Sequence, residues 1–309
     1  MNMKNLISIS ELQDKEILQM VKIARKFKKN NNSSNIRASY KIKNKTLALI
    51  FQKPSTRTRL SFEVAMMELG GNSIFLSESD LQISRGELMK DTARTLSKYV
   101  DIVAIRTYNN SDIQEFIDNS SIPVINALSN TNHPCQALSD IQTIIEEKKT
   151  LRNLKITWIG DSNNVLNDFM FAALKLGADF SLACPNKYSP KKQVLKVADE
   201  IMAENNSTFS IMTDPIKAVK DSDVVVTDRI ISMGDKNKES KKKVFLPKYR
   251  VTEKIMSNAK DDAIFMHCLP AVRGEEVSEK VIDGKNSVIW QQVENKLHMH
   301  KALIWSMLK

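Results

Sequence analysis

Cysteine is scarce in this sequence, and its spacing excludes a disulfide framework. Three cysteines (Cys135, Cys184 and Cys268) occur among 309 residues, and none belongs to a C-x-x-C pair. Proteins of oxidising compartments use cysteine in closely spaced sets, so this pattern favours a reducing compartment. We therefore expect a cytoplasmic protein, with Cys184 as a buried core thiol.

Long apolar runs are also missing. No stretch approaches the roughly 20 apolar residues that cross a bilayer, and mean hydropathy is −0.31. The N-terminus lacks the pattern of a signal peptide. Its apolar residues instead recur as on one face of a helix. They predict an amphipathic helix through Leu6, Ile9, Leu12, Ile17 and Val21. We expect no membrane association.

Common signatures of metal and cofactor sites are absent from the sequence. It contains no H-E-x-x-H, EF-hand or Walker A motif, and GDSNN at 160–164 lacks the G-x-G-x-x-G of dinucleotide turns. The four histidines (His133, His267, His298 and His300) show no spacing typical of metal ligands. We expect no metal and no cofactor, with His298 and His300 at the surface.

Positive charge is in excess, with a formal net charge of +10 and a pI of about 9.3. Such a balance raises nucleic acid as a partner. The lysines are scattered, however, and the densest group, KNKESKKK at 236–243, has no aromatic residue and is interpreted as a solvated loop. Zinc-finger and RRM signatures are missing. We expect anionic metabolites, and no nucleic acid, as partners.

Strand-like apolar runs alternate with helical patterns along the chain. The runs are nearly continuous in Val and Ile, which is typical of parallel strands covered on both faces. The expected strands are 46–51, 102–105, 124–126, 156–159, 180–183, 224–227 and 264–266. A charged connection near residue 150 predicts two doubly wound α/β domains, 1–150 and 151–292. A last helix, at about 293–309, is expected to return to the first domain.

The segment FQKPSTRTRLSFEVAMMELG at 51–70 predicts a turn from a strand into a helix. Leu60, Val64 and Met67 recur at helical spacing, and Gly70-Gly71 has the form of a helix stop. One hydroxyl would suffice as an N-cap. Two arginines in the first turn conflict with the helix dipole, which favours negative charge there. A bound phosphate removes the conflict, so we favour an anion site over a plain cap.

Polar or reactive side chains follow six of the expected strands. Ligands of open α/β sheets bind beyond the carboxyl ends of the strands. These side chains therefore predict an active site in the cleft between the two domains. They are Ser55–Arg59, Arg106, His133–Gln136, Gly160–Asn164, Asp228 and His267–Pro270.

The side chains of the first half suit a phosphorylated acyl compound. Arginines clamp phosphate with two parallel hydrogen bonds. Thr58, Arg106 and His133 can donate to a carbonyl oxygen that becomes an oxyanion. Gln136 can form hydrogen bonds with an adjacent amide group.

The side chains of the second half suit a zwitterionic amino acid. Asp228 can bind an ammonium group, while Asn164 and Ser232 can bind a carboxylate. Cys268 is expected between the two halves.

Four segments together resemble the ornithine carbamoyltransferases of the aspartate/ornithine transcarbamoylase family. They are STRTR at 55–59, HPCQ at 133–136, Asp228 with SMG at 232–234, and HCLP at 267–270, in matching order and spacing. The resemblance implies transfer of a carbamoyl group from carbamoyl phosphate to the δ-amine of L-ornithine, giving L-citrulline and phosphate. The rivals are a transcarbamoylase for another amine, such as putrescine, and a non-catalytic homologue.

The resemblance also implies which residues bind each substrate. Carbamoyl phosphate is expected at Ser55, Thr56, Arg57, Thr58, Arg106, His133, Gln136, Leu269 and Lys296. Ornithine is expected at Asn164, Asp228, Ser232, Met233 and Cys268. The implied catalytic residues are Arg106, His133, Cys268 and Thr58. The family is trimeric, which implies a homotrimer in which Gln82 reaches carbamoyl phosphate in a neighbouring subunit.

Three positions depart from the family's pattern. Lys296 stands where the family has the arginine of E-N-R, so the charge is kept and the planar fork of donors is lost. We expect weaker carbamoyl phosphate binding than an arginine would give. Arg229-Ile230 replaces Thr-Trp, and Asn167-Asp168 stands where His-Ser is frequent. The ligand positions survive, although the packing of the loop after Asp228 is expected to differ.

Overall fold

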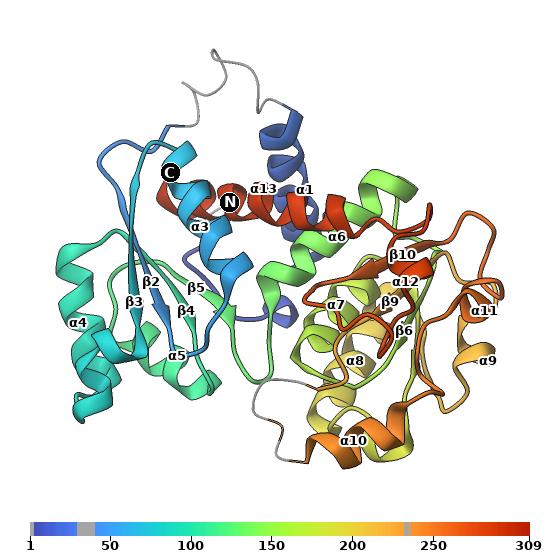
Figure 1. Ribbon diagram of the computed structural model, residues 1–309. Coiled ribbons are helices and arrows are strands. Elements are labelled where there is room, and N and C mark those ends of the chain that lie inside the picture. Colours follow the sequence, from blue (N-terminus) through green and yellow to red (C-terminus); the bar gives the residue numbers. More distant parts are fainter. Residues whose placement is uncertain (1–2, 30–40, 232–234, 236) are drawn as a thin grey trace. The chain divides into compact units, whose positions relative to one another are not determined.

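The computed structural model describes residues 3–29, 41–231, 235 and 237–309. The chain divides into two compact units (Figure 1). Unit 1 comprises Met1–Gln142 with Glu294–Lys309, and unit 2 comprises Thr143–Val293. Each contains a five-stranded parallel sheet surrounded by helices, which confirms the predicted α/β class. The division falls within helices α6 (Pro134–Lys148) and α13 (Ile289–Leu308).

The sheet of unit 1 has the strand order β1-β5-β4-β2-β3. Its strands are β1 (Asn5–Leu6), β2 (Thr46–Phe51), β3 (Asn72–Ser77), β4 (Ile102–Arg106) and β5 (Val124–Leu128). The helices that lie wholly in this unit are α1 (Asp14–Lys29), α3 (Thr56–Glu68), α4 (Met89–Tyr99) and α5 (Asn110–Asp118). The three inner strands are almost entirely buried, as their continuous apolar runs predict.

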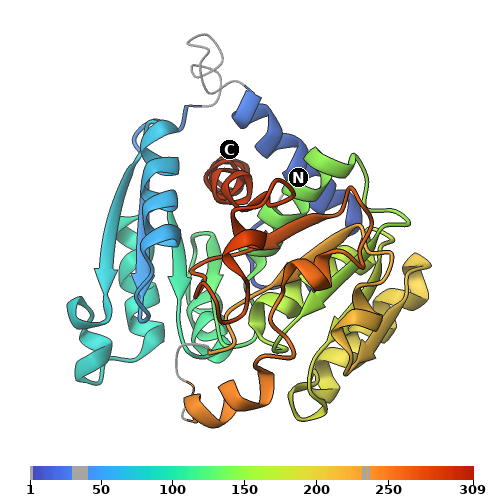
Figure 2. The same cartoon turned by 45° about the vertical axis from the view of Figure 1, so that its right-hand side comes forward.

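Helix α13, at the end of the chain, packs against helices α3 and α1 within unit 1. The ring of His300 stacks on Phe62 of α3, with ring centroids 3.7 Å apart. Farther along α13, Trp305 meets Phe27 of α1 edge-on at 6.4 Å. Figure 2 shows α13 nearly end-on, between α3 and α1. The last helix is therefore part of the core of unit 1.

The sheet of unit 2 has the strand order β10-β9-β6-β7-β8. Its strands are β6 (Lys155–Ile159), β7 (Asp179–Ala183), β8 (Phe209–Met212), β9 (Val224–Thr227) and β10 (Ile264–His267). Its helices are α7 (Asn164–Lys175), α8 (Lys192–Asn205), α9 (Pro215–Val219), α10 (Lys238–Phe245), α11 (Glu253–Met256) and α12 (Glu279–Ile282). None of the helices in the described ranges is both long and apolar enough to cross a membrane.

The N-terminal helix begins later than its periodicity predicts. Helix α1 starts at Asp14, whereas Leu6 lies in β1 and Ile9 in a 3-10 turn. The side chain of Asn5 accepts the N–H of Val124 at 3.0 Å, and β1 pairs with β5. These sheet hydrogen bonds compete successfully with the helix, so the prediction was wrong for the first part of this segment.

Helix α3 has the predicted limits but a different buried face. Ser55 is its N-cap, and Gly70 beyond its end has a φ of +85°, which favours glycine. The buried apolar side chains are Phe62, Ala65 and Met66, whereas Leu60 and Met67 are 56% and 66% exposed. The spacing of Leu60, Val64 and Met67 thus predicted a helix correctly but marked its outer face.

The lysine-rich segment is not the solvated loop that its composition predicts. Lys238–Phe245 forms helix α10, and Phe245 is fully buried in the core of unit 2. Lys241, one turn earlier, is also buried. Within this mostly charged segment, Lys241 and Phe245 therefore form the buried face of a helix.

Candidate functional site

The first part of the site lies where β2 turns into α3. The Oγ of Ser55 accepts the backbone N–H of Thr58 at 3.3 Å, so one hydroxyl acts as the cap. Thr58 is buried, whereas Thr56 is exposed. Phe51, the last residue of β2, pairs with Arg106, the last residue of β4. Parallel pairing thus places Arg106 at the sheet edge from which α3 starts.

The two arginines of the STRTR segment have different surroundings. Arg59 bonds the carboxylate of Glu63 at 3.0 Å, and its guanidinium lies 3.6 Å from the ring centroid of Phe75. In the part of the chain that the structure describes, no acidic side chain forms an ion pair with Arg57, which is half-buried. Arg59 is therefore a structural residue, and Arg57 is the one suited to an external anion.

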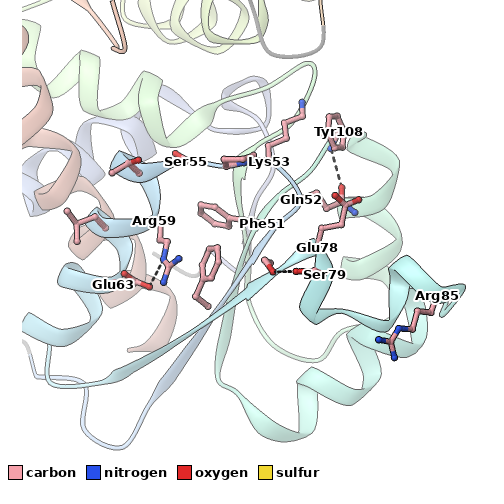
Figure 3. A pocket seen from close by; sticks show the side chains of 15 residues that line it. Phe51, Gln52, Lys53, Ser55, Arg59, Glu63, Glu78, Ser79, Arg85 and Tyr108 are labelled. Carbon is pink, nitrogen blue, oxygen red and sulfur yellow. Dashed lines mark hydrogen bonds and ion pairs between the residues drawn. The ribbon is translucent and has the colours of Figure 1, made fainter.

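A pocket of about 1090 Å³ borders the start of α3 (Figure 3). Its wall includes Ser55 and Thr56 together with the cations Lys53, Arg59 and Arg85. Burial lowers the pKa of Lys53, and the neighbouring charge of Arg106 lowers it further. Of the predicted carbamoyl phosphate residues of unit 1, only Ser55 and Thr56 line the pocket; the lining does not include Arg57, Thr58, Arg106, His133 or Gln136.

A second group of predicted residues meets where α6 and α13 contact each other in unit 1. Lys296 Nζ donates to Gln136 Oε1 at 2.9 Å, and Gln136 Nε2 donates to Asp140 Oδ1 at 2.8 Å. All three side chains are at most 7% exposed. Lys296 and Asp140 hold the Gln136 amide from both ends, which fixes its orientation. Asp140 is a residue that the sequence did not single out.

His133, directly before α6, is buried close to this group. Burial lowers its pKa well below the ordinary histidine value, and the charges of Lys296 and Arg106 and the nearby His300 lower it further. The imidazole is therefore neutral at physiological pH. A neutral imidazole still carries one N–H group, so His133 can donate a hydrogen bond.

The site residues of unit 2 gather at the ends of β9, β6 and β10. Cys268 Sγ donates to Asp228 Oδ1 at 3.1 Å, and Asn163 Nδ2 donates to Asp228 Oδ2 at 2.7 Å. Asn163 also caps α7 by accepting the N–H groups of Val165 and Leu166. Residues that follow the two neighbouring strands, β6 and β10, thus orient the carboxylate of Asp228. Asn163, unlike the predicted Asn164 beside it, was missed, although an Asn before a helix is a typical cap.

The HCLP segment is shaped by a buried histidine. His267 Nδ1 accepts the N–H of Leu269 at 2.9 Å, so Nε2 carries the proton and donates to Glu276 Oε1 at 3.2 Å. Leu269 has a φ of +58°, a strained conformation for this residue. Although Asp228, His267 and Cys268 have potential metal ligand atoms within 4.8 Å of one another, both His267 nitrogens are already engaged.

The structure describes two further predicted residues. Gln82 is exposed on the 3-10 helix Gln82–Arg85. Asn164 is the first residue of α7. Ser232 and Met233, predicted to bind ornithine, lie outside the described residues.

The prediction that His298 and His300 lie at the surface was wrong. Both are at most 1% exposed, and His300 Nδ1 bonds the hydroxyl of Ser61 at 2.9 Å. Helix α13 is packed between other helices, so polar residues on it become buried. No local pattern in the sequence marks that arrangement.

Comparison with known families identifies the class of protein. Residues 4–146 match the carbamoyl-P binding domain of the aspartate/ornithine carbamoyltransferase family, and residues 152–307 match its Asp/Orn binding domain. The chain therefore belongs to the aspartate/ornithine carbamoyltransferase family.

Within this family, similar relatives are named ornithine carbamoyltransferase. An ornithine carbamoyltransferase of Pyrococcus horikoshii is 50% identical over 264 residues, which cover 85% of this chain and 83% of the relative. That of Caldicellulosiruptor saccharolyticus is 46% identical over 98% of this chain and 97% of the relative. The solved ornithine carbamoyltransferase of Pyrococcus furiosus superimposes with a TM-score of 0.91 at 45% identity, covering 97% of this chain and 96% of that one.

Because His298 is buried, we predict that the folded protein loses stability at acid pH. Burial and the charge of Lys301 lower its pKa to about 4 in the folded state, against about 6.5 when unfolded. Protonation below pH 6.5 therefore favours the unfolded chain, and the stabilising effect is complete only above that pH. Between pH 7 and pH 5, His298 should account for a loss on the order of 2 kcal/mol in the free energy of unfolding.

Urea unfolding of the native protein and of His298→Gln at both pH values measures this contribution. The glutamine does not titrate, so its cost is the same at both pH values. We expect the stability gap between the two proteins to be smaller at pH 5 than at pH 7. An equal gap at both pH values would show that His298 does not contribute.

Proposed function

We propose that this chain transfers the carbamoyl group of carbamoyl phosphate to the δ-amine of L-ornithine, giving L-citrulline and phosphate. The observation that carries the proposal is the match, over nearly the whole chain, to relatives named ornithine carbamoyltransferase. The Asp228 carboxylate, held by Cys268 and Asn163, supports a substrate with an ammonium group.

Unit 1 is proposed to bind carbamoyl phosphate. The free N–H groups at the start of α3, with Ser55, Thr56, Arg57 and Thr58, suit the phosphate. Arg106 and neutral His133 suit the carbonyl oxygen, and Gln136, held by Lys296, suits the amide. Leu269 of unit 2 and Gln82 of a neighbouring subunit are proposed to complete this site.

Unit 2 is proposed to bind ornithine through Asp228, Asn164, Cys268, Ser232 and Met233. An alkyl ammonium has a pKa of about 10.4, so under roughly 0.1% of it is free amine at pH 7. The site must therefore favour the neutral δ-amine, while Asp228 binds the α-ammonium. Cys268, whose thiol bonds Asp228, is proposed to tune the δ-nitrogen.

Catalysis in this proposal rests on positioning and on oxyanion stabilisation. The neutral amine attacks the carbonyl carbon, a C–N bond forms, the C–O bond to phosphate breaks, and the departing phosphate takes the proton that the amine loses. Thr58, Arg106 and His133 stabilise the negative charge that develops on the carbonyl oxygen. We further propose a cytoplasmic homotrimer that acts in arginine biosynthesis.

Citrulline formation from carbamoyl phosphate tests the function. Ornithine, putrescine, N-acetylornithine and aspartate are assayed in parallel, and turnover is expected with ornithine alone. Turnover with a different amine would refute the assignment of Asp228 to the α-ammonium. No turnover with any amine would favour a non-catalytic homologue.

The two arginines of STRTR should differ in their effect on carbamoyl phosphate. Arg57→Met removes a charge-assisted contact with phosphate and should raise the KM for carbamoyl phosphate about 10- to 100-fold. Arg59→Met, the matched control, breaks the pair with Glu63 and should mainly lower the melting temperature. Equal losses of carbamoyl phosphate affinity in both variants would contradict the assignment.

Lys296→Arg should strengthen carbamoyl phosphate binding, lowering its KM about threefold or more, because guanidinium offers a planar fork in place of one point charge. The native amine already donates to Gln136, so an arginine can keep that bond and add donors. Lys301→Arg, on the same helix and paired with Glu68, is the control. An unchanged affinity in Lys296→Arg would show that this departure from the family is neutral.

A further inference from the structure

A buried cation in unit 2 is shared by two carboxylates. Lys241 of α10 places Nζ 2.6 Å from Asp161 Oδ2 and 2.8 Å from Asp235 Oδ2, and its side chain is only 8% exposed. We call Lys241, Asp161 and Asp235 the Lys241 cluster. Asp161 is 80 positions away from Lys241 in the sequence, so their contact joins α10 to the turn after β6.

That turn carries residues of the proposed ornithine site. Gly160, Asp161 and Ser162 connect β6 to Asn163, the cap of α7 that donates to Asp228. Only one residue separates Asp161 from Asn163 along the backbone. The side chain of Asp161 therefore has a direct mechanical connection to the hydrogen bond that orients Asp228.

The charges around the turn require a cation. Burial raises the pKa of Asp161, the bond from Lys241 opposes that rise, and the negative charges of Asp235 and Asp228 add to it. Burial alone would lower the pKa of Lys241, but its hydrogen bonds to the two carboxylates raise it. Without the lysine, like charges would face one another in a poorly solvated space.

The neighbouring lysine is in a different situation. Lys242 pairs with Glu275 at 2.7 Å, and both side chains are about one-third exposed. Exposed pairs of this kind contribute little to stability. Lys242 therefore provides a matched control on the same helix.

We propose that Lys241 is a positioning residue for ornithine, acting through Asp161 and the 160–164 turn to hold Asn163 and Asp228 in their binding arrangement. The inference rests on the proposed function. It assigns to α10 control over the affinity for the second substrate.

Kinetics of Lys241→Met, Lys241→Arg and Lys242→Met test this role. Lys241→Met should raise the ornithine KM about tenfold or more, while the KM for carbamoyl phosphate stays the same. Lys241→Arg restores the cation and should recover most of the affinity. Lys242→Met should behave as the native protein.

Melting temperatures separate positioning from a merely structural role. If Lys241→Met melts earlier but keeps the native ornithine KM, or if both KM values rise equally, the proposal is overturned. Should Lys241→Met fail to fold, Asp161→Asn decides, because it keeps the size of the side chain and removes one charge. It should raise the ornithine KM several-fold, and an unchanged value would refute the proposal.

Calorimetry with ornithine, on protein saturated with a phosphonate analogue of carbamoyl phosphate, gives a readout independent of turnover. Binding to the native protein that is weakened in Lys241→Met supports the inference. If the native protein neither turns over nor binds ornithine, the proposed function fails first, and the inference fails with it. Equal binding to both proteins refutes the inference alone.

Discussion

Parallel strand pairing is the constraint on which the candidate site of each unit depends. In unit 1 the register sets Phe51 beside Arg106 and Arg106 beside Leu128, so three strands end at one edge. In unit 2 Thr227 lies between Ile159 and His267 in the same way. Residues that are far apart in the sequence meet because each lies at such an end or a few residues beyond it.

Much of the fold was predictable because buried parallel strands have a distinctive composition. β2, β4 and β9 are continuous apolar runs, and the sequence located them within a residue or two. The edge strands β3 and β8 were missed, since their side chains are partly exposed and their apolar runs are interrupted. β1 has only two residues, and its pairing depends on a partner more than a hundred positions away.

The site was predictable to a different degree. Sequence motifs predicted site residues near the carboxyl ends of strands, and Ser55, Arg106, His133 and Asp228 each lie at such an end or a few residues beyond it. The resemblance implied Arg57 and not Arg59 as a phosphate residue, but the contacts of Arg59 with Glu63 and Phe75 were not predictable because they depend on the tertiary structure. The roles of polar partners such as Asp140, Asn163 and Lys241 were missed because they arise from tertiary contacts.

The electrostatics of the two units differ in a way that matches their proposed ligands. Unit 1 surrounds a neutral imidazole with Lys296 and Arg106, so an anion is the ligand that would lower the energy of the site. Unit 2 holds the half-buried carboxylate of Asp228, with a thiol and an amide as its donors. Each half thus has an excess charge opposite to that of the group it is proposed to bind.

Lys296 and Asp140 bond opposite ends of the Gln136 amide and so fix which end is the oxygen. This orientation determines which chemical group can lie beside Gln136. Lys296 occupies one lone pair of Oε1, and the second lone pair remains as an acceptor. If Gln136 faces the reacting group, that acceptor calls for an N–H on the acyl carbon. Carbamoyl phosphate has one, whereas acetyl phosphate has a methyl group there and would leave a buried oxygen unsatisfied. A lysine and an aspartate that do not react would thus enable the protein to tell a urea-forming acyl donor from an amide-forming one.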